Sequence, residues 1–173
     1  GELQLVSTGI SGIPVFQISR YISRQLAESK SPYIEVDFLP EFSKDELLGE
    51  ILRRRQNEQE LENSYILEGI MNNKLVDAIL LRAGINKKSK LKDLTTEQCE
   101  HICSLIKQFE AEVKDTAGFD NAQVTCGGVS KIEVNFKNMS SKICKGLYLA
   151  GEIVDVDGIC GGYNLQWAWS SGY

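Results

Sequence analysis

The feature that most constrains this chain is its glycine-rich C-terminal end, residues 146–173, which reads GLYLAGEIVDVDGICGGYNLQWAWSSGY. Residues 147–150 form an apolar run long enough for a buried strand, and an acidic patch follows at residues 153–157. A glycine pair, Gly161-Gly162, then leads into residues 163–169, which look like the opening of a helix. The segment is therefore predicted to run from strand to acidic turn, glycine loop and helix N-terminus.

This order of elements is suited to binding a nucleotide-like ligand. Paired glycines let a ligand approach the backbone closely. The first amides of a helix point outward unpaired and can donate to a phosphate or an electron-rich carbonyl. A buried strand and a helix joined by a plain glycine turn would produce the same pattern, so the spacing alone leaves both interpretations open.

Longer stretches of the chain resemble a known family. The C-terminal end is similar to the signature of aminoacetone-oxidase-like, NAD(P)/FAD-dependent oxidoreductases, the YhiN-like flavoproteins. Three upstream segments resemble the same family in the expected order: GELQLVSTGISGIPVFQISRYI at 1–22, VDFLP at 36–40 and AQVTCGGVSKIEVN at 122–135. The resemblance covers essentially the whole chain, and the helical middle matches most loosely.

The resemblance implies an FAD site in the C-terminal segment. Glu152 would face the ribityl–pyrophosphate part of FAD, and the amides of residues 161–164 would face the flavin ring. The expected cofactor-binding residues are Gly151, Glu152, Asp157, Gly161, Gly162, Tyr163, Asn164 and Leu165. No residue can be assigned as a catalytic acid or base. The implied reaction passes hydride or electrons between a small organic substrate and FAD, with NAD(P)H or oxygen as the partner.

The chain departs from the family pattern at its start. Family members begin with a Rossmann unit whose G-x-G-x-x-G motif binds the FAD diphosphate, and this sequence contains no such motif. We therefore expect a truncated, C-terminal fragment that is inactive alone and does not retain FAD. We also expect residues 120–173 to be rearranged, paired within the fragment, or exchanged between two copies in a swapped homodimer.

The composition predicts a soluble cytoplasmic protein. The 19 Lys and Arg residues against 24 Asp and Glu residues give a net charge of −5, which argues against nucleic acid as a partner. No apolar run is long enough to cross a membrane. The five scattered cysteines indicate free thiols in a reducing compartment. His101 lies about 200° around a predicted helix from Cys99, so no metal site is expected.

Periodicity predicts an α+β fold in which a helical insert interrupts a β-rich, barrel-like domain. Residues 1–40 and 109–119 are assigned to the β-rich domain, residues 41–108 to the insert, and residues 120–173 to the C-terminal part of the FAD-binding domain. Helices are expected at 15–27, 43–52, 63–71, 74–82 and 95–106. Strands are expected at 33–38, 109–114, 122–125, 130–135 and 147–150.

Two capping boxes delimit helices of the expected insert. Ser43 with Glu46, and Thr95 with Gln98, have the spacing at which a side chain and a backbone amide satisfy each other in both directions. A non-enzymatic helical interaction module is the alternative function for such a chain. The glycine-rich end favours the flavoenzyme, because an interaction module has no need for Gly161, Gly162, Tyr163 and Asn164 after an acidic turn.

Three other features of the C-terminal end remain open between a binding role and a structural role. Asp155 and Asp157 alternate with valines, so both carboxylates should share one face, as flavin contacts or as surface acids. Cys160, at the helix start, is expected to be a passive small side chain rather than a redox partner. Trp167 and Trp169 cannot share one helical face, so one is expected in the core and the other against flavin or a neighbouring domain.

Overall fold

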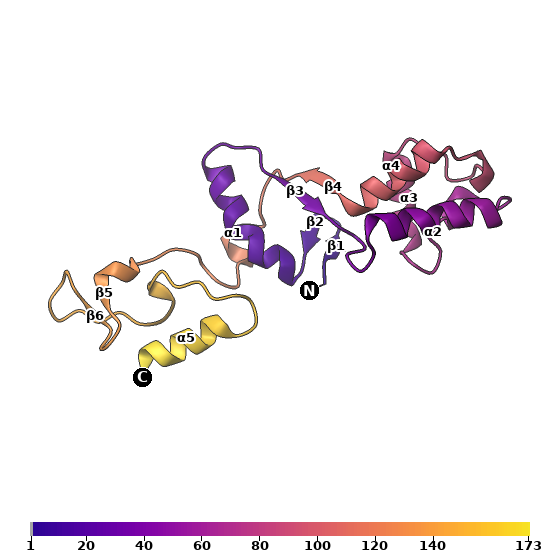
Figure 1. The fold of residues 1–173 in the computed structure, drawn as a ribbon. Helices are drawn as coiled ribbons and strands as arrows, with labels where there is room; N and C mark the ends of the chain where they lie inside the picture. Colours follow the sequence, from indigo (N-terminus) through magenta and orange to yellow (C-terminus); the bar gives the residue numbers. More distant parts are fainter. Residues whose placement is uncertain (1) are drawn as a thin grey trace. The chain divides into compact units, whose positions relative to one another are not determined.

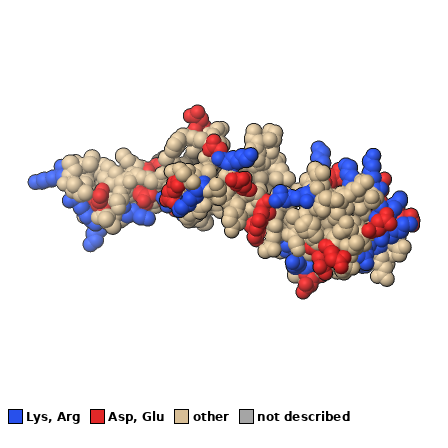
Figure 2. All heavy atoms as spheres, turned by 90° about the horizontal axis from the view of Figure 1, so that it is seen from above, with Lys and Arg blue, Asp and Glu red and all other residues tan. Residues whose placement is uncertain are grey.

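The computed structural model describes residues 2–173 and divides them into two compact units (Figure 1). The helical unit comprises residues 33–112. The glycine-rich unit comprises residues 2–32 and 113–173. Among the described residues, no helix is long and apolar enough to cross a membrane. Positive and negative side chains are interspersed on the face shown in Figure 2.

The helical unit is built from α2 (Lys44–Asn57), α3 (Asn73–Arg82) and α4 (Thr96–Lys107). Both expected capping boxes are present: Ser43 and Glu46 cap α2, and Thr95 and Gln98 cap α4. Each box satisfies amides that the helix itself leaves unpaired, and this fixes where the helix begins. The predictions for these two helix starts are confirmed.

A two-stranded antiparallel sheet closes the helical unit. Strand β3 (Tyr33–Val36) pairs with β4 (Phe109–Glu112), with Tyr33 opposite Glu112 and Val36 opposite Phe109. The two strands therefore bring the start and the end of the unit together, as the adjacent arrows in Figure 1 show. Both strands were expected from alternation, although each is shorter than predicted.

Sixteen buried side chains form the core of the helical unit. Most are aliphatic and come from the three helices and the turns between them; they are Leu39, Leu47, Ile51, Ile66, Leu67, Met71, Val76, Ile79, Leu80, Ile85, Leu91, Leu94, Cys99, Ile102, Cys103 and Ile106. The helix predicted over 63–71 is wrong. Its first residues, Asn63–Tyr65, form a single 3-10 turn, and bonds of the tighter i→i−3 type continue after it, from Ile66 N to Asn63 O and from Glu68 N to Tyr65 O.

The glycine-rich unit begins with a hairpin and a helix. Strand β1 (Gln4–Val6) pairs with β2 (Gly9–Ser11), and α1 (Ile13–Ala27) follows. Gly12 is the N-cap of α1 and Pro14 lies in the first turn, where its missing amide proton costs nothing. The prediction of this helix is confirmed, whereas β2 was not expected.

The rest of this unit is mostly irregular and ends in a helix. Strand β5 (Val134–Asn135) pairs with β6 (Ser140–Ser141), and α5 (Tyr163–Gly172) closes the chain. Short 3-10 turns lie at Phe119–Asn121, Lys131–Glu133 and Gly151–Ile153. The predicted opening of α5 at residue 163 is confirmed. A core of three side chains, Val134, Leu149 and Val154, supports these elements.

Three strands predicted in this unit are wrong. Residues 122–125 are irregular, and residues 130–135 contain a 3-10 turn before the two-residue β5. Residues 147–150 form a single bridge, in which Ser141 N donates to Leu147 O at 2.8 Å and Leu149 N to Met139 O at 2.9 Å. The run thus finds its hydrogen-bond partners at positions 139–141 of the same chain. The predicted barrel-like domain and the insert boundaries stay predictions.

Candidate functional site

The candidate site is the loop that begins at residue 151, together with the first turn of α5, and the two contain all eight residues expected to bind a cofactor. A parallel bridge joins Val154 in its first part to Val129, the residue that follows the glycine pair Gly127-Gly128. Val129 N donates to Ile153 O at 2.8 Å, and Asp155 N donates to Val129 O at 2.9 Å. A Cβ at Gly128 would lie 2.4 Å from Ile153 O, and its φ is +133°. Only glycine fits at this crossing.

Gly151, at the beginning of the loop, is held by the last helix. Its amide donates to Ser171 Oγ at 2.8 Å, and its carbonyl accepts from Trp167 Nε1 at 3.0 Å. Trp167 is half-buried and packs edge-on against Phe136, with ring centroids 5.9 Å apart. Gly151 is therefore an anchor for the loop, and Trp167 is the tryptophan that packs inward.

The second half of the loop is closed by Asn164. The Gly158 amide donates to Asn164 Oδ1 at 2.7 Å, and Asn164 Nδ2 donates to Gly158 O at 3.2 Å. A Cβ at Gly158 would lie 2.8 Å from the Cβ of Tyr163. The side-chain amide thus holds residues 158–164 in a tight turn, so Asn164 shapes the loop with its side chain.

The N-terminus of α5 has no side-chain cap. Its N-cap, Gly162, is left-handed at φ +94°, and the first helical bond runs from Gln166 N to Gly162 O at 2.9 Å. Among the described residues, the amides of residues 163–165 have no acceptor. These unpaired donors carry the positive end of the helix dipole and suit an electron-rich oxygen of a ligand.

The remaining predicted residues do not converge on one cavity. Glu152 is exposed, and its Oε1 accepts from Thr125 N at 2.6 Å. Tyr163 and Leu165 are exposed at the helix start. Asp157 instead pairs with Arg20 of α1, with Nη1 and Oδ2 2.9 Å apart. Asp157 therefore binds a partner 137 positions away, which no local pattern could have indicated.

Cys126 lies next to this ion pair. Its Sγ accepts from Arg24 Nη2 at 3.3 Å. Burial, together with the neighbouring Asp157 carboxylate, raises the pKa of the Cys126 thiol. The thiol is thus kept protonated and is a poor nucleophile. Among residues 2–173, no group of three His, Cys, Asp or Glu side chains is arranged to hold a metal ion.

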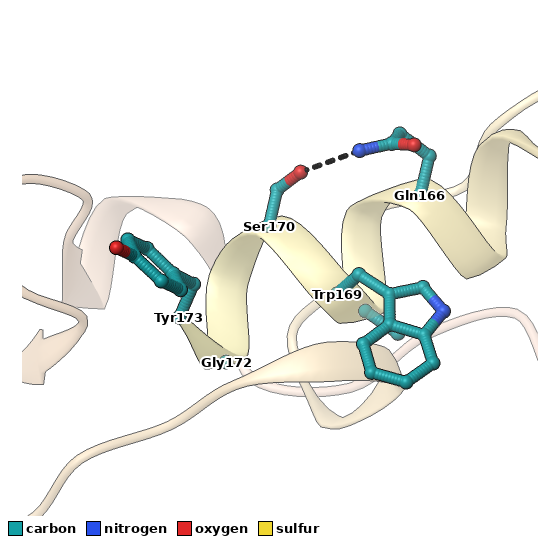
Figure 3. Close-up of a pocket in the computed structure, with 6 residues that line it drawn as sticks. Gln166, Trp169, Ser170, Gly172 and Tyr173 are labelled. Atoms are coloured by element: carbon teal, nitrogen blue, oxygen red, sulfur yellow. Dashed lines mark hydrogen bonds between the residues drawn. The ribbon is translucent and has the colours of Figure 1, made fainter.

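A surface hollow of about 740 Å³ lies beside the last turns of α5 (Figure 3). It is lined by Gln166, Ala168, Trp169, Ser170, Gly172 and Tyr173. Gln166 Nε2 donates to Ser170 Oγ at 2.9 Å along this helix. Because one helix and the residue that follows it supply every lining residue, the hollow is an open surface rather than an enclosed ligand site.

Comparison with known proteins agrees with the sequence resemblance at the family level. Residues 15–173 match the family described as HI0933-like protein Rossmann domain. This chain belongs to the HI0933-like family. The match includes the whole glycine loop and α5. The finer, aminoacetone-oxidase-like assignment stays a prediction.

Three curated relatives of this HI0933-like chain have names that describe oxidoreductases or a synthase. The chain is 43% identical over its full 173 residues to the 3-dehydro-bile acid delta(4,6)-reductase of Clostridium scindens, of which it covers 42%. It is 35% and 32% identical over 172 residues, 99% of the chain, to the ribosomal RNA dihydrouridine synthases of Haemophilus influenzae and Escherichia coli, and it covers 40% of each. The chain therefore spans about two fifths of the length of these relatives.

Proposed function

We propose that this chain is part of an FAD-dependent oxidoreductase that reduces a carbon–carbon double bond of a small organic substrate, with NAD(P)H as the electron donor. The family match carries the proposal. The names of the relatives support the type of reaction, because a delta(4,6)-reductase and a dihydrouridine synthase both add hydrogen across carbon–carbon double bonds. When bound, FAD supplies the hydride chemistry of such a reaction.

The geometry of the loop supports the proposal of a flavin cofactor. The unpaired amides at the start of α5 can donate to an electron-rich oxygen of the flavin, and the Asn164 clamp holds them in place. Glu152 uses one carboxylate oxygen on Thr125 N and keeps the other for hydroxyl groups such as those of the ribityl chain. The chain thus contributes positioning groups, and the catalytic acid or base is not assigned to any of its residues.

A small organic substrate is preferred to RNA for this chain. The net charge is −5, and positive and negative side chains both occur over much of the face in Figure 2. RNA binding depends on neutralising phosphates with clustered Lys and Arg. The higher identity to the bile acid reductase, 43% against 35% and 32%, points in the same direction.

Flavin binding is the first test of this proposal. The visible absorbance after gel filtration would be measured for the 173-residue chain and for the full-length protein made from its gene. We expect a yellow full-length protein and a colourless 173-residue chain, because the loop supplies only some of the contacts to FAD. A colourless full-length protein would contradict the proposal and would favour the non-enzymatic helical interaction module.

A matched pair of variants tests the loop itself in the full-length protein. Asn164→Ala removes the clamp on Gly158 and should weaken FAD binding about tenfold, the effect of losing the equivalent of one or two hydrogen bonds. Gln166→Ala removes a side chain whose bond is to Ser170 on the same helix and should leave FAD binding unchanged. Equal FAD affinities in the two variants would exclude the loop from the flavin site.

A further inference from the structure

The outward face of α5, near its last turns, is aromatic and uncovered. Trp169 is 78% exposed and Tyr173 is fully exposed. The two residues are four positions apart, and Tyr173 N donates to Trp169 O, so both side chains lie on the same side of the helix. Trp167 points away from this side and is bound to the Gly151 carbonyl. Packing within the chain therefore accounts for Trp167 and leaves Trp169 unexplained.

The same face has a recess beside its projecting rings. Besides Trp169 and Tyr173, the surface hollow of about 740 Å³ is lined by residues with small side chains, which leave room above the backbone: Ala168, Ser170 and Gly172 (Figure 3). A surface with both a projecting ring and a recess can be complementary to itself, as a two-fold symmetric dimer requires. We propose that this face binds the same face of a second copy of the chain, with Trp169 of each copy in the hollow of the other.

The absence of charge on α5 favours a second copy over an acidic or basic partner. The helix, all of which the structure describes, contains no Asp, Glu, Lys, Arg or His. Two copies can therefore meet along it without repulsion between like charges. A strongly charged partner would lose hydration of its ionic groups against this face and would find no opposite charge in return.

The available area sets the strength of the contact. An aromatic side chain buries about 150–250 Å², so two from each copy bury about 600–1,000 Å² in all. Stable, specific interfaces bury more than about 1,200 Å². The dimer should thus be weak, with a dissociation constant of about 10–500 μM. The inference is independent of flavin binding, because neither Trp169 nor Tyr173 is among the predicted cofactor-binding residues.

The first test is sedimentation equilibrium of the 173-residue chain at concentrations from about 5 μM to about 1 mM, which bracket the expected dissociation constant. We expect the mean mass to rise from that of one chain towards that of two. A mass of one chain at every concentration would overturn the proposal and would leave the face to a different partner. A mass that rises beyond two chains would also overturn it, because a two-fold contact closes at the dimer.

Tryptophan fluorescence locates the contact. Acrylamide reaches the exposed Trp169 in the monomer, and its access should fall as the dimer forms. Trp167 is already half-buried and should change little. Quenching that stays constant while the mass doubles would place the interface elsewhere and would contradict the proposal.

A matched pair of variants separates a specific contact from general adhesion of apolar surface. Trp169→Ser should weaken dimerisation at least about tenfold, since each dimer loses two central aromatic rings. Ile132→Ser is the control, because Ile132 is 79% exposed in the same unit and does not line the hollow. It should leave dimerisation unchanged. Equal weakening by both variants would overturn the proposal.

A third variant fills the hollow and keeps the exposed rings. A Cβ at Gly172 meets no atom within 4 Å, and glutamine is a better helix former than glycine, so Gly172→Gln should not disturb the monomer. It should abolish dimerisation by occupying the space for Trp169 of the second copy. Circular dichroism checks that all three variants keep their helices. A Gly172→Gln chain that dimerises as well as the parent would exclude the hollow as the contact.

Discussion

The helical unit and the glycine-rich unit reach a defined structure in different ways. The helical unit buries 16 side chains in one core, and capping boxes begin two of its three helices. The hydrophobic core of the glycine-rich unit contains three, and none of the residues of α1, all of which the structure describes, is buried. Its conformation rests on hydrogen bonds to loop backbone, on close glycine crossings and on the Arg20–Asp157 ion pair.

This difference means that the unit expected to be the more stable one is not the unit that carries the candidate binding groups. Burial of apolar area is the main source of folding free energy, so the helical unit should be the stable part of the chain. Segments with few buried contacts open more readily, and binding loops belong to this class. The unpaired amides of α5 and the exposed face around Trp169 both lie in the glycine-rich unit, where contacts with a ligand or a second copy can replace contacts that the chain lacks.

The largest expected effect is on the core of the helical unit. Ile102→Ala removes a side chain that is 1% exposed and should destabilise this unit by about 3 kcal/mol through the cavity it leaves. Urea unfolding would be followed by far-UV circular dichroism, to which α2–α4 contribute more helical residues than α1 and α5 together, and by tryptophan fluorescence. Both tryptophans lie in the glycine-rich unit, so we expect the part of the circular dichroism transition that reports α2–α4 to move and the fluorescence transition to stay in place.

The control for this substitution is Leu81→Ala on α3. Leu81 is 81% exposed, so its loss should change the free energy of unfolding by less than about 0.5 kcal/mol. If Ile102→Ala shifts the fluorescence transition as far as the circular dichroism transition, the two units unfold as one and the comparison above is wrong.

An intermediate effect is expected from the two tryptophans of α5. Trp167→Phe removes the bond from Nε1 to the Gly151 carbonyl and should destabilise the glycine-rich unit by about 1 kcal/mol. Trp169→Phe changes a side chain that is 78% exposed and should have almost no effect on unfolding. The fluorescence of the remaining tryptophan reports each urea transition. Equal midpoints would show that the anchor at Gly151 adds nothing to stability.

The smallest expected effect concerns the pH dependence of the helical unit. Hydrogen bonds from Arg53 and then Arg54 hold the pKa of Glu50 at about 2. A lowered pKa in the folded state stabilises the protein above the ordinary pKa of glutamate, about 4.3, and this contribution is lost as the pH falls through about 2. The pair is partly solvated, so its contribution should be at most about 1 kcal/mol.

Glu50→Gln tests this linkage. At pH 7 the variant should unfold at a lower urea concentration than the parent, and the difference should shrink as the pH falls from about 4 towards 2. Glu100→Gln is the control, because Glu100 is exposed on α4 and has no ion pair among the described residues. A stability difference for Glu50→Gln that does not change between pH 7 and pH 2 would contradict the assigned pKa.

Prediction from the sequence succeeded where neighbours along the chain decide the structure. The capping boxes at Ser43 and Thr95 and the start of α5 at Tyr163 each depend on residues within about one helical turn. It failed for residues 122–125 and 147–150, whose composition suits a strand. A strand also needs a partner, and residues 147–150 meet only the short segment at 139–141.

The same distinction holds for the candidate site: some of its features were predicted from the sequence and others were not. The sequence indicated the glycine loop and included Asn164 among its binding residues, because residue types and short spacing carry that information. It did not indicate that Asn164 closes the loop on Gly158, or that Gly128 crosses the backbone at Ile153. The Arg20–Asp157 ion pair was not anticipated either, because its partners lie 137 positions apart in the sequence.

By itself, the sequence determined the family resemblance, the starts of α2, α4 and α5 and the position of the loop, since these depend on residue identity and on contacts within a few positions. The tertiary structure alone decided which charges meet, which amides stay unpaired and which apolar runs find partners. The physical reason is that ion pairs and backbone hydrogen bonds act over a few ångströms in space, and separation along the chain does not indicate that distance.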